Sequence, residues 1–563
     1  MARQIKEIGM TWTMVGGLLG GLGLFLLGMR LMTDGFKYAA GRALRGILER
    51  STRTPLRGLL SGALITALVQ ASAMVTVATI GFVNAGLMSL RQAVTVIYGT
   101  NIGTTMTGWL VAAVGFDFDI QKLALPAIGI GMFLRVFRGE SRAGHLGEAL
   151  AGFGLFFSGL DVLKGIFGDL GQSLQFTALS GYGLFSTAAF VGAGFLLTLL
   201  LQSSSAALAI VLTSAAGGVL GVTDAAAMVI GANVGTTITA LLVVLGATSS
   251  AKRVAAAHIA FNLITGVVAF ATLPLILKFL DFLQNSFGLG AGPATELALF
   301  HTLFNLLGVL LLWPLTGTLT RLLETRFLVG DADESQPKYL DRTLTTTPVL
   351  ALHALTRELA RLGKMTRDLA REAISSERVA TQSFQQKSET VDRLGEAIGD
   401  YSSRMQQSNL PPILAEVLPN ALRVSRYYSE IAELSLLVGQ AHQQAKELEH
   451  AEIQTAIHAF NSRVVRLLSS IDDYTPEYPT EVYDGEMKEL QSAYQSLKSR
   501  LLRSGTEGRL PVRRIVEQLD TESNIRRLAE QADKAARYLQ TLLDYLEQNG
   551  AGTKVTESSA KAS

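Results

Sequence analysis

The chain has 563 residues, a formal net charge of +2 and no cysteine. Without cysteine it can have no disulfide, thiol nucleophile or thiolate metal site. Its charges are unevenly distributed: residues 1–330 have a net charge of +7 with one charged residue in ten, whereas residues 331–563 have a net charge of −5 with more than one in four. This break predicts a membrane domain over 1–330 followed by a soluble domain.

Seven segments of the first part are long enough, or nearly so, to cross a bilayer core, which takes about 20 apolar residues in a helix. They lie at about 10–33, 94–114, 122–137, 147–167, 225–247, 255–278 and 297–318. We expect the first to be a retained span and not a signal peptide, because no small-residue cleavage site follows it. The sequence therefore predicts an all-α, polytopic membrane domain.

Two further apolar stretches, at about 58–86 and 186–219, are interrupted near their middles by polar residues. Each could form one polar helix, but a re-entrant hairpin of two half-helices accounts better for the central break. The Lys- and Arg-rich loops fall on one side of the membrane only if neither stretch crosses it, as the positive-inside rule requires. The same rule places the N-terminus outside and the soluble domain in the cytoplasm.

The polar interruptions belong to a repeated pattern. The first glutamine–serine motif is Gln70-Ala71-Ser72-Ala73, and the second, 132 residues later, is Gln202-Ser203-Ser204-Ser205. A Gly-x-Asn-x-Gly-Thr-Thr segment follows each motif, at 99–105 and 231–237. This predicts two repeats, at about 10–140 and 147–280, before the final span. Three crossings separate the copies, so we expect the second to be inverted and the hairpin tips to meet near the midplane, where secondary transporters bind substrate.

The side chains of these motifs suit an oxyanion together with alkali cations. Helix N-termini at a hairpin tip attract anions, and hydroxyl and amide oxygens suit sodium. The motifs contain no carboxylate or imidazole, so their side chains are poor ligands for Zn²⁺ and Ca²⁺. The alternative to ion binding is that the small and hydroxylated residues of the motifs serve close packing between helices. The candidate binding residues are Gln70, Ser72, Asn101, Thr104, Thr105, Gln202, Ser203, Ser204, Ser205, Asn233, Thr236 and Thr237.

Over about residues 10–320 these motifs and the inverted halves resemble the bacterial members of the type II sodium–phosphate cotransporters. The resemblance implies transport of inorganic phosphate with sodium as the coupling ion, no further cofactor, and a place in the cytoplasmic (inner) membrane. It also implies that both glutamine–serine motifs line the substrate and sodium sites. In the first motif, Ala71 and Ala73 stand where the family has serines, which removes two hydroxyls.

Two further pairs of polar residues recur within the membrane domain. His258 and His301 each precede an asparagine by four residues, which puts both side chains on one helix face. We favour hydrogen bonding between helices for them over direct ligation, while a protonation role stays open. Arg30 and Asp161 occupy equivalent places in the two copies. They could form a bridge, but snorkelling to the interface is the favoured interpretation.

The soluble part has helical periodicity over 346–547, broken at Pro411-Pro412, around Pro476 to Pro479 and near Gly505 to Pro511. This predicts five or six long helices in an antiparallel bundle, after a linker at 331–345 and before a disordered tail at 548–563. The architecture resembles PhoU-like domains. Acidic pairs such as Glu396 with Asp400 and Asp520 with Glu522 are attributed to a solvated charged face. A di-metal bundle site takes two Glu-x-x-His motifs, and only one, Glu447 to His450, stands out, so no metal site is assigned.

The sequence thus favours sodium-coupled transport of inorganic phosphate. Two alternatives stay open: a phosphate exporter or valve regulated by the C-terminal bundle, and a membrane-anchored phosphate sensor. No catalytic motif, cofactor fingerprint or P-loop is present, so an enzyme is not expected. The expected partners are phosphate, sodium and the lipid bilayer, with no nucleic acid; the bundle could serve self-association or a regulatory partner.

Overall fold

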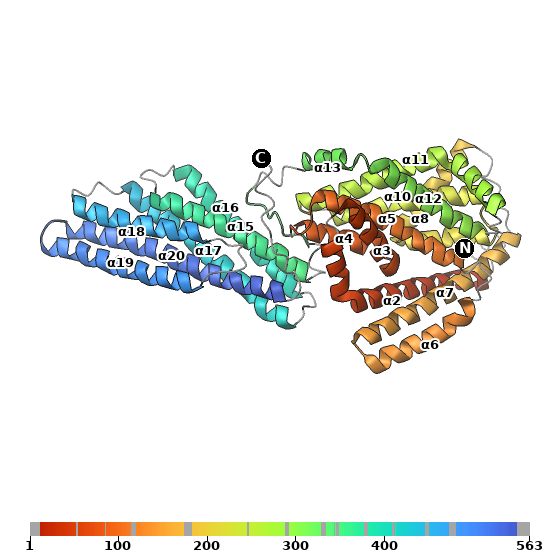
Figure 1. The fold of residues 1–563 in the computed structure, drawn as a ribbon, viewed down its shortest axis with the longest axis horizontal. Coiled ribbons are helices and arrows are strands. Elements are labelled where there is room, and N and C mark those ends of the chain that lie inside the picture. Colours follow the sequence, from red (N-terminus) through yellow and green to blue (C-terminus); the bar gives the residue numbers. More distant parts are fainter. Residues whose placement is uncertain are drawn as a thin grey trace. The chain divides into compact units, whose positions relative to one another are not determined.

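The computed structural model describes residues 12–51, 54–84, 86–113, 120–173, 183–244, 247–287, 292–327, 334–342, 344, 348–375, 381–407, 410, 412–444, 450–471 and 480–548. Within these ranges the chain forms eighteen helices and no strand. It divides into two compact units, Met1–Phe327 and Leu328–Ser563 (Figure 1). The described residues exclude part of the predicted linker, Pro411, Glu447, the segment 472–479 and the tail from 549 onward.

The first unit contains twelve helices within the described ranges. In chain order they are α2 (Trp12–Ser51), α3 (Pro55–Val69), α4 (Ser72–Asn84), α5 (Leu90–Ala113), α6 (Ile120–Arg138), α7 (Arg142–Ser173), α8 (Leu184–Leu201), α9 (Ser204–Ala216), α10 (Val222–Val243), α11 (Ser249–Phe287), α12 (Pro293–Leu312) and α13 (Thr316–Glu324).

Six helices of the described chain are long and apolar enough to cross a membrane, so the protein is a multi-pass membrane protein. They lie in α2, α7, α8, α10, α11 and α12. The predicted spans at 94–114 and 122–137 are helices, α5 and α6, but are not among the six. Threonine, asparagine and glycine lower the apolarity of α5, and α6 carries Lys122, Arg135 and Arg138. Conversely, the sequence predicts α8 as half of a hairpin, yet its 18 uncharged residues are long enough to cross alone.

The two copies of the sequence repeat pack in the same way. Gly99 of α5 lies so close to α3 that an added Cβ would be 2.0 Å from the Leu59 carbonyl oxygen. Gly231 of α10 lies in the same relation to α8, with an added Cβ 1.9 Å from the Val191 carbonyl oxygen. Gly99 and Gly231 are 132 residues apart in the sequence, and so are their partners Leu59 and Val191. The repeated glycine therefore brings two backbones into contact where any side chain would separate them.

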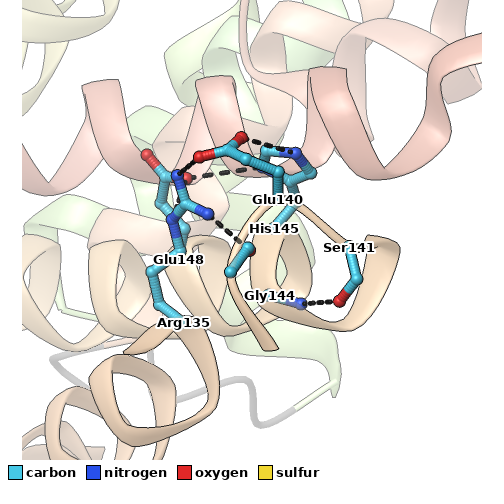
Figure 2. A network of polar contacts seen from close by, with 7 residues as sticks. Arg135, Glu140, Ser141, Gly144, His145 and Glu148 are labelled. Carbon is cyan, nitrogen blue, oxygen red and sulfur yellow. Dashed lines mark hydrogen bonds and ion pairs between the residues drawn. The ribbon is translucent and has the colours of Figure 1, made fainter. Parts of the chain in front are cut away.

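A polar network fixes the turn between α6 and α7 (Figure 2). Arg135 of α6 forms ion pairs with Glu140 at 2.7 Å and with Glu148 of α7 at 3.2 Å. His145 lies between the same two carboxylates, 3.5 Å from Glu140 and 3.6 Å from Glu148. The Ser141 hydroxyl accepts a hydrogen bond from the Gly144 amide at the start of α7. These contacts hold the ends of the two helices together.

In its described residues the second unit is a bundle of six helices (Figure 1): α15 (Pro348–Ser375), α16 (Thr381–Gln407), α17 (Pro412–Gln444), α18 (Ala451–Ser470), α19 (Thr480–Thr506) and α20 (Val512–Leu546). Buried leucine, isoleucine, alanine and tyrosine side chains form its core, among them Leu355, Ile398, Tyr428, Leu467, Leu497 and Leu528. The break between α19 and α20 contains Gly508 at a φ of +68° and ends at Pro511, the residue before α20.

A buried carboxylate of α15 binds the backbone of the linker that precedes the bundle. Glu358 of α15 is completely buried. One of its oxygens accepts hydrogen bonds from the backbone amides of Lys338 and Tyr339, at 2.8 and 2.7 Å. The other is paired with the Arg361 guanidinium at 2.6 Å. A buried charge of this kind is tolerated because every one of its contacts is a charge-assisted hydrogen bond.

One acidic residue of the bundle departs from the solvated face that its sequence suggests. Glu396, Asp400 and Asp520 are exposed as expected, but Glu522 of α20 is completely buried. Gln518 donates a 2.7 Å hydrogen bond to one Glu522 oxygen, and the other oxygen has no partner. Burial raises the pKa of the Glu522 carboxyl to about 8, because removal from water disfavours the charged form.

Candidate functional site

Both glutamine–serine motifs lie at breaks between two helices, and both breaks have the same geometry. Gln70 ends α3 with φ 55° and ψ 29°, and Gln202 ends α8 with φ 52° and ψ 24°. A left-handed backbone is uncommon for residues other than glycine, and in the described chain it recurs elsewhere outside glycine only at Phe327. Each glutamine amide caps its own helix, by donating to the carbonyl of Ala67 at 2.5 Å or of Leu199 at 2.8 Å.

The second helix of each break begins differently in the two copies. Ser203 precedes α9, and its hydroxyl accepts a 3.2 Å hydrogen bond from the Ala206 amide. Ala71 stands at the equivalent place before α4 and has no hydroxyl to offer. A serine cap typically stabilises a helix by about 1 kcal/mol relative to alanine. The first motif therefore lacks an N-cap as well as two potential ligands.

The two motifs, 132 residues apart in sequence, meet in one cavity of about 310 Å³. Helices α2, α8, α10 and α11 contribute the rest of its wall. The lining residues are Leu26, Met29, Arg30, Thr33, Asp34, Gln70, Ala71, Ser72, Ala73, Thr198, Gln202, Ser203, Ser204, Ser205, Thr236, Thr239 and His258. Seven of the twelve residues predicted from the sequence are in this wall: Gln70, Ser72, Gln202, Ser203, Ser204, Ser205 and Thr236.

The other five predicted residues are not in the wall. They are buried, with exposed fractions of 4 to 8 %, and comprise Asn101, Thr104, Thr105, Asn233 and Thr237. The three threonines and Asn101 donate hydrogen bonds to backbone carbonyls of their own helices. Asn233 instead reaches α11, where its amide donates to the Asn262 side chain at 2.9 Å. In this structure four of these side chains form hydrogen bonds within their own helices, and Asn233 connects α10 to α11.

Thr107 of α5 joins the two motifs directly, and the sequence analysis missed it. Its hydroxyl donates a 2.7 Å hydrogen bond to Gln70 Oε1 and lies 3.3 Å from the Ser205 hydroxyl. Thr107 is 1 % exposed. The signal was available, because the match between the copies continues two residues beyond Gly-x-Asn-x-Gly-Thr-Thr, to Thr107 and Thr239. Thr239 lines the cavity.

The cavity wall has no net formal charge with its histidine neutral. Its charged side chains are Arg30 and Asp34 of α2, which form an ion pair at 3.7 Å. The remaining polar groups are hydroxyls, two glutamine side chains and the imidazole of His258. The first residues of α4 and α9 are also in the wall, so two helix N-termini border the cavity. This arrangement favours a small anion that accepts many hydrogen bonds.

The sequence matches a known family over most of the first unit. The model of the Na⁺/Pi-cotransporter family matches residues 24–165 and 184–290, which include both glutamine–serine motifs. The "Uncharacterized protein YqeW" of Bacillus subtilis is 30 % identical over 299 residues, which cover 53 % of this chain and 94 % of that protein.

Other relatives have descriptive names. The "Putative inorganic phosphate export protein YjbB" of Escherichia coli K12 is 29 % identical over 436 residues, 75 % of each chain. The "Sodium-dependent phosphate transport protein 2A" of Rattus norvegicus is 31 % identical over 114 residues, 20 % of this chain and 18 % of that protein. No solved structure matches the chain. The chain thus belongs to the Na⁺/Pi-cotransporter family, and it is a membrane transporter and not an enzyme.

Proposed function

We propose that this protein moves inorganic phosphate across the membrane and that the cavity between the two glutamine–serine motifs is its binding site. The observation that carries the proposal is the convergence of the two helix breaks. Two equivalent left-handed glutamines place Ser72 and Ser203 to Ser205 around one cavity of about 310 Å³. Hydroxyl donors and two helix N-termini are the groups that hold a phosphate without a metal ion.

The two motifs would contribute unequally. The second motif has three serines and a capped helix, whereas the first has one serine and an uncapped helix. Ser203 already uses its hydroxyl as the cap of α9. Ser204 and Ser205, with the α9 N-terminus, would therefore supply most of the donors to phosphate. Ser72 and Thr236 would complete the shell from the other side.

The net direction that we propose is export. Relatives that share three quarters of their length with this chain have the name "Putative inorganic phosphate export protein YjbB". Those matches extend beyond the membrane unit, since 436 residues exceed its length. The soluble bundle would then regulate release of phosphate in the manner of a valve. Sodium-coupled uptake is the second direction, and the matched family and the rat relative carry sodium in their names.

Sodium would bind beside the phosphate, where glutamine and serine oxygens and the carbonyls at the helix breaks provide hard, uncharged ligands. A cation in that place adds the positive charge that the wall lacks. If each ion favours the conformation that binds the other, the coupling is reciprocal, so sodium must tighten phosphate binding as much as phosphate tightens sodium binding.

The finer architecture is part of the same proposal. We infer two inverted repeats, each with a re-entrant hairpin formed by α3 with α4 and by α8 with α9. The identical 132-residue interval of the motifs, the left-handed glutamines and the glycine contacts supports it. The N-terminus would lie outside and the second unit, a PhoU-like regulatory bundle, in the cytoplasm of a cell whose inner membrane holds the protein.

Phosphate flux in proteoliposomes tests the proposal. The purified full chain is expected to release radiolabelled phosphate down its gradient, with and without an opposing sodium gradient to separate the two directions. Ser204→Ala combined with Gln202→Ala should abolish most of the flux. Ser214→Ala, on the same helix but outside the cavity, should not. Phosphate binding without flux in any gradient would favour a sensor, and equal flux in the double variant would refute the assigned site.

A further inference from the structure

His258 of α11 is the imidazole of the proposed phosphate cavity, and its side chain faces that cavity with an unpaired ring. The residue is 5 % exposed and forms part of the wall. Its Nδ1 atom is sealed from solvent and has no hydrogen-bond partner. Nε2 is not sealed in this way, so it is the ring nitrogen that a bound ion can reach. An imidazole held without a partner beside a cavity is available to a ligand.

Two asparagines hold the helix turn that carries this imidazole. Asn262 Nδ2 donates a 3.0 Å hydrogen bond to the His258 carbonyl oxygen. Asn233 of α10 donates in turn to Asn262 Oδ1 at 2.9 Å. α10 also carries Thr236 and Thr239 of the cavity wall. The histidine is thereby fixed relative to the hydroxyls that surround the same space.

His301 of α12 has the same sequence context but not the same surroundings. Both histidines begin a His-x-x-Phe-Asn pattern, and Asn305 Nδ2 donates to the His301 carbonyl at 2.9 Å, as Asn262 does to His258. Yet His301 is 1 % exposed, is not in the cavity wall, and has both ring nitrogens sealed without a partner. The chain therefore contains a matched control for any role of His258 in the cavity.

The chemistry of the ring points to recognition of a protonated oxyanion. A neutral imidazole has one N–H donor and one lone-pair acceptor. Phosphate near neutral pH keeps at least one P–OH group that can donate to such an acceptor, whereas sulfate has no proton to give. Among the side chains of the wall, the other acceptor besides hydroxyls and amide oxygens is the Asp34 carboxylate, which is paired with Arg30.

We propose that His258 contacts the transported ion and sets its preference for phosphate over sulfate, with Nε2 accepting a hydrogen bond from the P–OH group. This inference rests on the proposed function, since it assumes that phosphate occupies the cavity. It assigns the ring proton to Nδ1. It also predicts that arsenate, which is protonated like phosphate, is recognised in the same way.

The test compares four full-length proteins for binding of radiolabelled phosphate, with arsenate and sulfate as competitors. His258→Phe keeps the ring shape and removes the acceptor. It should weaken phosphate and arsenate binding about tenfold, as expected for one lost hydrogen bond to a bound ion, and leave sulfate competition unchanged. His258→Gln retains an acceptor and should recover part of the loss. His301→Phe should stay within about twofold of wild type, and monodispersity in detergent checks the fold of each variant.

The outcomes separate the two proposals. If wild type binds no phosphate, the proposed function fails. If wild type binds phosphate but His258→Phe is unchanged, or loses phosphate and sulfate equally, the role of His258 is refuted while the transport proposal stands. An effect of His301→Phe as large as that of His258→Phe would also refute it. Should His258→Phe not fold, His258→Asn replaces it, because its shorter side chain withdraws the acceptor from the cavity.

Discussion

Thr107 offers the sharpest test of the cavity, because it is the side chain that connects the two motifs. In Thr107→Val the shape is nearly conserved, but the 2.7 Å hydrogen bond to Gln70 Oε1 and the 3.3 Å contact with the Ser205 hydroxyl are lost. Leaving a buried acceptor without its donor costs about 1–3 kcal/mol. Gln70 borders the cavity, where water can replace part of the bond. We therefore expect a cost of about 1.5 kcal/mol.

Since both partners of Thr107 belong to the proposed binding site, this cost should appear in phosphate affinity. About 1.5 kcal/mol corresponds to a roughly tenfold weaker binding constant. The assay is the concentration dependence of phosphate flux in proteoliposomes, with Thr107→Ser expected to restore the wild-type value. Thr100→Val is the control, since Thr100 lies on the same helix and its hydroxyl donates only to the Ile97 carbonyl. If Thr107→Val and Thr100→Val have the same affinity, the bridge does not shape the site.

Three further substitutions test other parts of the structure. Gly231→Ala would place a Cβ 1.9 Å from the Val191 oxygen, so it should lower the melting temperature and yield strongly, whereas Gly192→Ala, with nothing within 4 Å, should not. Ala71→Ser should cap α4, stabilise the protein by about 1 kcal/mol and tighten phosphate binding; unchanged stability would contradict the capping argument. Glu522 is protonated in the folded protein up to about pH 8, but its ordinary pKa is 4.5. The free energy of unfolding of wild type should thus fall as pH rises from 5 to 8, whereas that of Glu522→Gln should not. The difference between the two proteins at pH 8 should be on the order of 3 kcal/mol; melting temperatures that change with pH in parallel would refute this.

Much of the fold and of the cavity could be predicted from the sequence, because the information was local or repeated. Long uncharged stretches predict helices, and matching intervals predict that Gln70 and Gln202 play equivalent parts. The structure gives both glutamines the same backbone conformation and the same cap. The polar interruptions also coincide with the helix breaks, since Ser72 and Ser204 each begin a new helix.

Other features depend on contacts that no local pattern specifies. Thr107 meets Gln70 and Ser205 across 37 and 98 residues of chain. His258 and His301 have the same neighbours in sequence, and only the packing of α11 and α12 decides that the first borders the cavity. The sequence pattern places Glu522 with Asp520 on a solvated charged face, yet the helix turns it into the core. The 18-residue α8 can cross a membrane by length, although its repeat partner α3, with 15 residues, is shorter.

The glycine contacts constrain how such a transporter can change shape. At Gly99 helices α3 and α5 touch backbone to backbone, and at Gly231 helices α8 and α10 do the same. The two helices of a pair cannot slide past each other without a clash, so each pair should move as one rigid body. The contacts that break during the conformational change must therefore lie elsewhere. Thr107 of the α3–α5 pair contacts Ser205, which lies outside both helix pairs, with 3.3 Å between the two hydroxyl oxygens. Such hydroxyl contacts exchange partners at little cost. We infer that access alternates when these hydroxyl contacts at the cavity part and re-form, with the glycine-paired helices swinging as intact bodies.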